Sequence, residues 1–200
     1  MLEEYNNDEK IAARAWLFNL YMKVFGYVIP LDRQYWFLCN KQTRTNSESA
    51  QIVASGLATA EQLRGVDNNE EFILGNRLCW PEAEWFYGMW DMVLSTNLSA
   101  FNPALVYLDT TSTAISSALV SMTVNTMHRC PFNTMLCVNV MLNNPAYSND
   151  RWNSEDFIHN LGEKLSQKER DIWFNRDYEY YCYMGRSTVM AQYVFTSRVG

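Results

Sequence analysis

The chain has 200 residues, a formal net charge of −6 at pH 7 and a hydrophobic content of 48%. This length predicts a single domain over residues 1–200, with residues 1–30 as an N-terminal helical extension. The longest apolar runs fall far short of the roughly 20 residues that cross a bilayer, and the acidic balance disfavours a broad surface for non-specific nucleic-acid binding. We therefore expect a cytoplasmic protein without a membrane partner.

The N-terminal part of the chain predicts a helix, a strand and a second helix. Apolar residues at positions 11, 15, 18, 22 and 25 predict an amphipathic helix over residues 8–28 that packs on a sheet. Residues 35–39 read Tyr-Trp-Phe-Leu-Cys and predict the first strand, followed by a polar loop over residues 40–46. Ser47 or Asn46 can cap a helix over residues 48–55, which Gly56 ends.

The rest of the chain alternates strands and helices and closes with a hairpin. Strands are predicted at 63–67, 84–87, 104–108 and 134–142, and helices at 70–79, 113–127 and 154–165. Residues 172–174 and 178–184 are expected to form one arm of an antiparallel hairpin, and residues 188–195 the other. The predicted fold class is α/β: a doubly wound, mostly parallel, seven-stranded Rossmann-like sheet with a C-terminal antiparallel hairpin.

Cysteine, histidine and aromatic residues limit the other expectations. The five cysteines form no C-x-x-C pair, which favours buried reduced thiols over disulfides. With two histidines and no paired cysteines, a zinc site lacks its usual ligands and no metal is expected, although oxygen ligands for Mg²⁺ are present and leave that alternative open. Seven Trp and twelve Tyr residues indicate a bulky core or an interface, so a homo-oligomer or a protein partner bound through an aromatic surface stays open.

Two predicted strands end in a carboxylate. Asp67 ends the strand at 63–67, and Asp109 follows the strand at 104–108. In an open α/β sheet, ligands bind outside the carboxyl ends of the parallel strands. We therefore expect both carboxylates to open onto one crevice of the nucleotide-binding type.

With these elements, residues 33–200 resemble a class I S-adenosylmethionine (SAM)-dependent methyltransferase, whose seven-stranded sheet ends in such a hairpin. The resemblance implies SAM as the cofactor and methyl transfer to an unknown acceptor, such as nucleic acid or protein. It also implies that the loop after the first strand holds the methionine part, that the acid ending the second strand binds ribose and that the segment after the third strand meets adenine. The implied cofactor-binding residues are Asn40, Gln42, Asn46, Asp67, Asn68, Trp90 and Asp91, and the implied catalytic residues are Asp109, Thr110 and Thr111.

Two segments depart from that family's pattern. The loop from Cys39 to Ser47 contains no glycine where the family usually has G-x-G, so it binds the cofactor differently, binds something else or binds nothing. Residues 109–112 read Asp-Thr-Thr-Ser in place of the Asp/Asn-Pro-Pro-aromatic signature of DNA amino-methyltransferases. Residues 144–147 read Asn-Pro-Ala-Tyr but follow the fifth strand, where an Asn-Pro turn is the simpler interpretation.

Each singled-out residue also has a purely structural interpretation. Asp67 and Asp109 could cap the helices that follow them, and Trp90 could belong to the core. Other enzyme classes lack their motifs: the chain has no G-x-S-x-G elbow and no Walker A loop, and no histidine lies near Cys39 to activate it.

Two functions therefore remain from the sequence. The first is SAM-dependent methyl transfer, in which the enzyme acts mainly by positioning the reactants. The second is a non-catalytic interaction or accessory protein on the same scaffold, such as one from a virus or a mobile element. The acidic strand ends favour the first hypothesis, and the glycine-free loop favours the second.

Overall fold

The computed structural model describes residues 8–45, 47–113, 116–142, 154–174, 178–184 and 189–197. Its strands are β1 Gln34–Leu38, β2 Leu63–Asp67, β3 Glu84–Tyr87, β4 Pro103–Thr113, β5 Thr134–Met141, β6 Glu179–Met184 and β7 Val189–Ser197. Its α-helices are α1 Asp8–Phe25, α2 Glu48–Ala54, α3 Glu70–Cys79, α4 Trp90–Thr96, α5 Ser117–Arg129, α6 Ser154–Lys164 and α7 Gln167–Trp173. Short 3-10 helices cover Ala60–Gln62 and Leu98–Ala100.

The strands form one seven-stranded sheet in the order β3-β2-β1-β4-β5-β7-β6. Strands β1 to β5 pair in parallel, and β7 runs antiparallel between β5 and β6. The predicted fold class and the C-terminal hairpin are therefore confirmed. The chain order reverses between β1 and β4, and a crevice opens outside the carboxyl ends of the strands at such a switch point.

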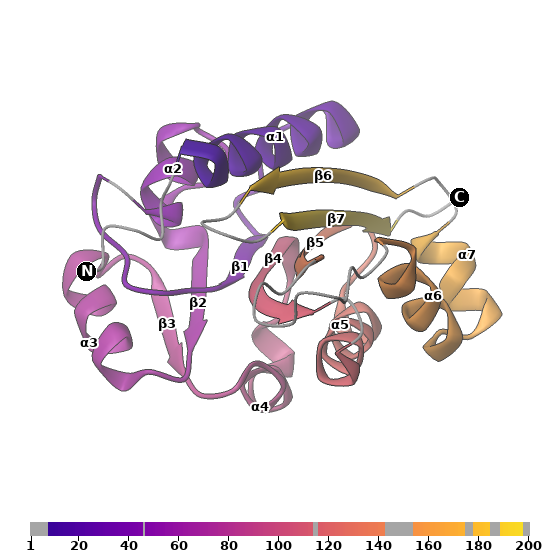
Figure 1. Ribbon diagram of the computed structural model, residues 1–200. Helices are drawn as coiled ribbons and strands as arrows, with labels where there is room; N and C mark the ends of the chain where they lie inside the picture. The colour runs from indigo at the N-terminus through magenta and orange to yellow at the C-terminus, as the bar shows by residue number, and fades with distance from the viewer. Residues whose placement is uncertain are drawn as a thin grey trace.

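Helices cover both faces of the sheet, so that side chains alternating along each strand enter two separate hydrophobic clusters (Figure 1). Helices α1, α2 and α3 pack on the face that carries Tyr35, Phe37 and Leu105. Helices α4 to α7 pack on the opposite face, which carries Trp36, Val106 and further buried apolar side chains. This double covering explains why the central strands read as continuous apolar runs.

Helix α1 packs on the sheet as predicted, but through a different face. It lies against β6 and α2 (Figure 1). The predicted contact residue Ile11 is 39% exposed, whereas Leu17 is fully buried. Arg14 is buried as well and forms an ion pair with Glu48. Apolar periodicity misplaced the face because Ala13, Leu17, Leu20 and Tyr21 form a second apolar stripe on the same helix, and this stripe is the buried one.

Two segments after β3 differ from the predictions. Helix α4 was not predicted, because Gly88-Met-Trp-Asp was interpreted only as a cofactor segment. Strand β4 continues to Thr113, where a helix start was expected. Helix α5 begins only at Ser117, after Ser116 accepts a hydrogen bond from the backbone N–H of Leu119.

The hairpin is shorter than predicted at its first arm. Residues Ile172 and Trp173 end helix α7 and do not belong to a strand, so that part of the prediction is wrong. The physical reason is local: Ser166 and Glu169 form a reciprocal capping box that starts a helix. A carboxylate three residues after a serine is the sequence signal that was overlooked.

Three further features bear on the expectations from composition. All five cysteines are free; Cys39 and Cys137 are buried, whereas Cys182 is exposed. Among the described residues, no three His, Cys, Asp or Glu side chains group as a metal site requires. None of the helices that the structure describes has the length and apolar character to span a membrane.

Candidate functional site

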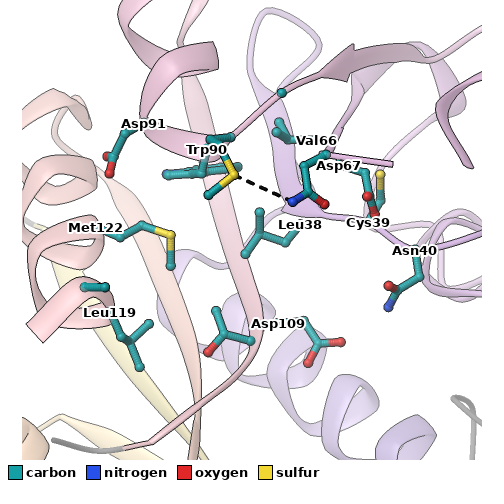
Figure 2. Close-up of a pocket in the computed structure, with 15 residues that line it drawn as sticks. Leu38, Cys39, Asn40, Val66, Asp67, Trp90, Asp91, Asp109, Leu119 and Met122 are labelled. Carbon is teal, nitrogen blue, oxygen red and sulfur yellow. Dashed lines mark hydrogen bonds between the residues drawn. The ribbon is translucent and has the colours of Figure 1, made fainter. Parts of the chain in front are cut away.

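A cavity of about 390 Å³ lies at the carboxyl ends of β1 to β4 (Figure 2). Asp67 and Asp109 both line it, which confirms that they open onto the same crevice. Apolar walls come from Leu38, Leu119 and Met122. The sequence-predicted residues that line it are Asn40, Asp67, Asn68, Trp90, Asp91, Asp109 and Thr110.

The remaining sequence-predicted residues lie elsewhere. Gln42 is buried beneath the loop after β1 and does not line the cavity. Thr111 belongs to β4, but its side chain is not among the described parts of the structure. Asn46 lies outside the described residues.

Asp67 ends β2 with a half-buried carboxylate that faces the cavity. Its Oδ1 accepts a hydrogen bond of 2.7 Å from the backbone N–H of Asn69. Burial raises the pKa of Asp67, and backbone hydrogen bonds partly oppose that rise. The alternative role as a helix cap is wrong, because Asn69 caps α3 by accepting from Glu71 and Phe72. The Asp67 carboxylate is thus held by the turn and presented to the cavity.

The segment after β3 supplies one buried and one exposed side chain. Trp90 is 3% exposed, and its indole N–H donates a hydrogen bond of 2.8 Å to Thr126 Oγ1. The core interpretation of Trp90 is therefore confirmed, although the residue also lines the cavity. Asp91 is exposed and accepts a hydrogen bond of 3.3 Å from Asn125 Nδ2. In Figure 2, Asp91 lies at the α4 side of the cavity.

The glycine-free loop after β1 is pinned by side chains. The backbone N–H of Gln42 donates to Asn76 Oδ1 over 2.7 Å, and Asn76 Nδ2 donates to the Asn40 carbonyl over 2.9 Å. The Gln42 side-chain carbonyl accepts from the Ser49 backbone N–H over 3.0 Å. Gln42 therefore ties the loop to α2 and α3, while the Asn40 side chain stays exposed at the cavity.

The carboxylate of Asp109, which lies within β4 four residues before its end, is paired with the N-terminal helix. Lys10 Nζ lies 2.5 Å from Asp109 Oδ2, with side chains only 13% and 8% exposed. Asn139 Nδ2 donates to Asp109 Oδ1 over 2.8 Å. Burial raises the pKa of Asp109, but Lys10 and Arg14 hold it below its usual value, so the carboxylate stays ionised. The capping alternative is wrong here too, because Ser116 caps α5.

A second buried ion pair lies beside the first one. Arg14 Nε is 3.7 Å from Glu48 Oε2, and the Tyr35 hydroxyl donates to Glu48 Oε1. Burial raises the pKa of Glu48 to about 7, against the opposing effect of Arg14. The first pair thus joins α1 to β4, and the second joins α1 to α2, where the Tyr35 hydroxyl links Glu48 to β1.

Sequence reasoning missed four residues of this region: Lys10, Arg14, Glu48 and Asn76. Asn76 had a usable signal, because it follows the apolar Ile73 by three residues in the predicted helix over residues 70–79 and so shares the helix face that is buried. The three charged residues had none, since charged side chains are expected on the surface unless they are paired.

Comparisons with known proteins bear on the fold. No protein-family model matches the chain, and no curated protein matches its sequence. Among solved structures, an O-methyltransferase from Bacillus cereus in complex with SAH is similar at 8% identity and a TM-score of 0.55, over 90% of this chain and 79% of that one. An rRNA methylase from Streptococcus thermophilus is similar at 8% identity and a TM-score of 0.53, over 94% and 97% of the two chains.

The [4+2]-cyclase SpnF is also similar, at 8% identity and a TM-score of 0.55, over 92% of this chain and 81% of that one. The chain thus has the fold of class I SAM-dependent methyltransferases. At such identities the similarity shows the fold alone, and a cyclase among the similar structures shows that this fold does not determine one reaction.

Proposed function

We propose that the chain binds SAM in the cavity at the carboxyl ends of β1 to β4 and transfers its methyl group to an acceptor. The observation that carries the proposal is the meeting of Asp67, Asp91 and Asp109 around one cavity at the switch point of the sheet. The described lining residues include these three carboxylates and neither Lys nor Arg; Asp109 is paired with Lys10, which lies beside the lining, whereas Asp67 and Asp91 have no ion pair among the described contacts. Such a cavity suits a ligand with a sulfonium cation, because opposite charges attract strongly where water is partly excluded.

Each end of the cavity has a separate task in this proposal. Asp67 accepts from the ribose hydroxyls, a role for which its half-buried carboxylate at the end of β2 is placed. Asp91 accepts from the exocyclic amine of adenine, and Trp90 with Met122 closes the apolar side. The polar end beyond β1 is left to the amino-acid arm and the acceptor.

The chemistry itself needs little from the protein beyond position. When bound, SAM would supply a methyl group on a positively charged sulfur: the acceptor atom would bond to the methyl carbon as the carbon–sulfur bond breaks, the thioether SAH would remain, and a proton on the acceptor atom would pass to water. Asp109 is ion-paired, and the Thr110 hydroxyl donates to the Asn139 carbonyl over 2.9 Å. These groups therefore contribute orientation of bound molecules rather than a titrating base.

Thermal unfolding in the presence of SAM and SAH tests the proposal. The melting temperature of the native chain should rise with the concentration of either ligand, because ligand that binds only the folded state stabilises it. Asp67→Asn should weaken binding by about 1 to 3 kcal/mol, the usual cost of an unpaired buried polar group. Asp32→Asn is the matched control, since Asp32 lies next to β1 at the opposite edge of the sheet.

One observation favours the alternative of a non-catalytic interaction or accessory protein. Gln42, expected to hold the cofactor, binds the backbone and side chain of Ser49 and lies away from the cavity. If neither ligand shifts the melting temperature of the native chain at millimolar concentration, methyl transfer is excluded and the scaffold role is favoured. An unchanged affinity of Asp67→Asn would leave ligand binding in place but remove Asp67 from it.

A further inference from the structure

The ion pair between Lys10 and Asp109 lies at the edge of the proposed cofactor cavity. Helix α1 brings Lys10 to Asp109 of β4, although the two residues are almost a hundred positions apart in the sequence. Desolvating two charges costs about as much as their attraction returns, so a buried pair is weak support for stability alone. An ion pair kept beside a cavity is instead a preformed binding surface for a ligand that carries both charges.

The carboxylate of this pair faces the cavity and is held in one orientation. Asp109 Oδ1 accepts from Asn139 Nδ2 over 2.8 Å, and Oδ2 lies 2.5 Å from Lys10 Nζ. An ionised carboxylate has about four lone-pair sites, so Asp109 can accept from a ligand without losing these two contacts. Asn40 lines the same end of the cavity with an exposed amide (Figure 2).

The order of the strands sets the distance between this end and the proposed ribose site. Asp67 ends β2 and Asp109 belongs to β4, with β1 between them. Two strand spacings of about 4.8 Å separate these two carboxylates by roughly 10 Å along the crevice. In SAM, the C5′ carbon, the sulfur and two methylenes link the ribose ring to the α-carbon. This link is of comparable length.

We infer that Lys10, Asp109 and Asn40 bind the zwitterionic amino-acid end of the cofactor. Asp109 accepts from the α-ammonium group, while Lys10 and the Asn40 amide donate to the α-carboxylate. The inference rests on the proposed function and deepens it. It gives Asp109 an anchoring role in place of the acceptor-orienting one that its position in the sequence predicts.

This assignment accounts for the missing glycines. A glycine-rich loop binds a ligand with closely approaching backbone. In the loop after β1 of this chain, the Gln42 backbone N–H and the Asn40 backbone carbonyl instead form hydrogen bonds with the Asn76 side chain. Charged side chains from α1 and β4 then supply the contacts that the loop backbone does not.

Two ligands that differ only in the amino-acid arm test the inference. SAH carries the zwitterion, and 5′-methylthioadenosine lacks it. By titration calorimetry, the native chain should bind SAH at least about tenfold more tightly, since charge-assisted hydrogen bonds are the strong ones. Lys10→Met should weaken SAH binding by roughly tenfold or more and change the affinity for 5′-methylthioadenosine by less than about twofold.

Further variants separate binding from folding. Lys23→Met is the matched control, because Lys23 lies in the last turn of the same helix and is exposed. Asn40→Ala changes an exposed side chain and should also lower the affinity for SAH selectively, which keeps the test valid if Lys10→Met does not fold. Asp67→Asn should weaken both ligands, since both carry the ribose.

The outcomes distinguish this inference from the proposed function. If the native chain binds neither ligand, the proposed function and this inference both fail. The native chain could instead bind both ligands while Lys10→Met and Asn40→Ala each lower the affinities for the two ligands equally or not at all. In that case only the amino-acid assignment is overturned. Selective loss of SAH affinity in either variant, with Lys23→Met unchanged, supports the assignment.

Discussion

The two faces of the sheet are built from different chemistry. On the face covered by α4 to α7, the central strands bury apolar side chains such as Trp36, Leu108 and Val138. On the face covered by α1 to α3, the same strands also bury Tyr107 and Asn139, which bond to each other over 2.8 Å. We call the face covered by α4 to α7 the apolar face. The face covered by α1 to α3 combines apolar packing with a polar network, and we call it the mixed face.

The polar network gathers where the fold forms its cavity. Asn139 Nδ2 contacts Tyr107, Asp109 and Tyr183, and Gln192 Nε2 donates to the Tyr107 hydroxyl over 3.0 Å. Buried polar groups are costly unless they are paired, so their positions are strongly specified. The comparison indicates that both faces contribute apolar packing, while the mixed face also determines where α1 lies and which charges reach the cavity.

The largest effect is expected on the apolar face. Trp36 is fully buried, and its ring stacks on Phe86 and packs edge-on against Trp90 and Phe101. Trp36→Ala should lower the free energy of unfolding by about 3 to 5 kcal/mol, through lost burial and the cavity left behind. Urea unfolding of the native and Trp36→Ala chains at pH 5.5 and pH 8 measures this loss of stability. The loss should be equal at both pH values, and a strong pH dependence would contradict the contrast between the faces.

Arg14→Leu should give a loss of similar size on the mixed face, but one that depends on pH. At pH 8 Glu48 would lose the partner that favours its ionised form, so folding would either bury an unpaired carboxylate or require it to take up a proton, at a cost of about 3 kcal/mol. At pH 5.5 Glu48 takes up a proton, so the loss should be smaller. Urea unfolding at the two pH values measures the difference. Adding Glu48→Leu to Arg14→Leu should restore most of the stability at pH 8, and failure to do so would exclude the ion pair as the cause.

Glu48 should also give the native chain a pH-dependent stability. Its folded pKa is about 7 and its usual value is 4.5, so between these values the folded chain holds a proton that the unfolded chain releases. The contribution of Glu48 to the free energy of unfolding is therefore complete below pH 4.5. It falls by about 2 to 3 kcal/mol as the pH rises toward 7.

Asp109 acts in the opposite direction, because its lowered pKa contributes stability that is lost only in more acidic solution. Urea unfolding of native and Glu48→Gln chains from pH 5 to pH 8 isolates the effect of Glu48. The difference in stability between the two chains should change steadily across that window. A constant difference would show that Glu48 is ionised in the folded chain throughout.

A smaller loss of stability is expected from a substitution at Gly65, which lies on the mixed face next to β3, where the apolar packing is close. A Cβ atom added at Gly65 would overlap the ring of Trp85, whereas one added at Gly75 in α3 meets nothing within 4 Å. Gly65→Ala should cost about 1 to 3 kcal/mol through overpacking. Gly75→Ala is the matched control and should stabilise the chain by up to about 1 kcal/mol through helix propensity. Melting temperatures of both variants test the pair, and equal shifts would contradict close packing at Gly65.

The sequence by itself was sufficient for the order and type of most elements. Strand β2, helix α3 and strand β3 have the predicted bounds, because short apolar runs there are bounded by caps and a proline. The carboxylates Asp67 and Asp109 were placed at one cavity by the same logic, since parallel strands present their carboxyl ends at one edge. These features depend on near neighbours in the chain and on one general rule of sheet topology.

Only the tertiary structure decided which charged residues are buried and what they touch. Lys10 meets Asp109, and Arg14 meets Glu48, across separations that no local pattern encodes. A charged side chain such as that of Arg14 is expected in water, and its burial becomes favourable only when another element brings a partner. The sequence therefore determined the order of the strands and the meeting of Asp67 and Asp109 at one cavity, and long-range charge pairing decided how α1 lies beside that cavity.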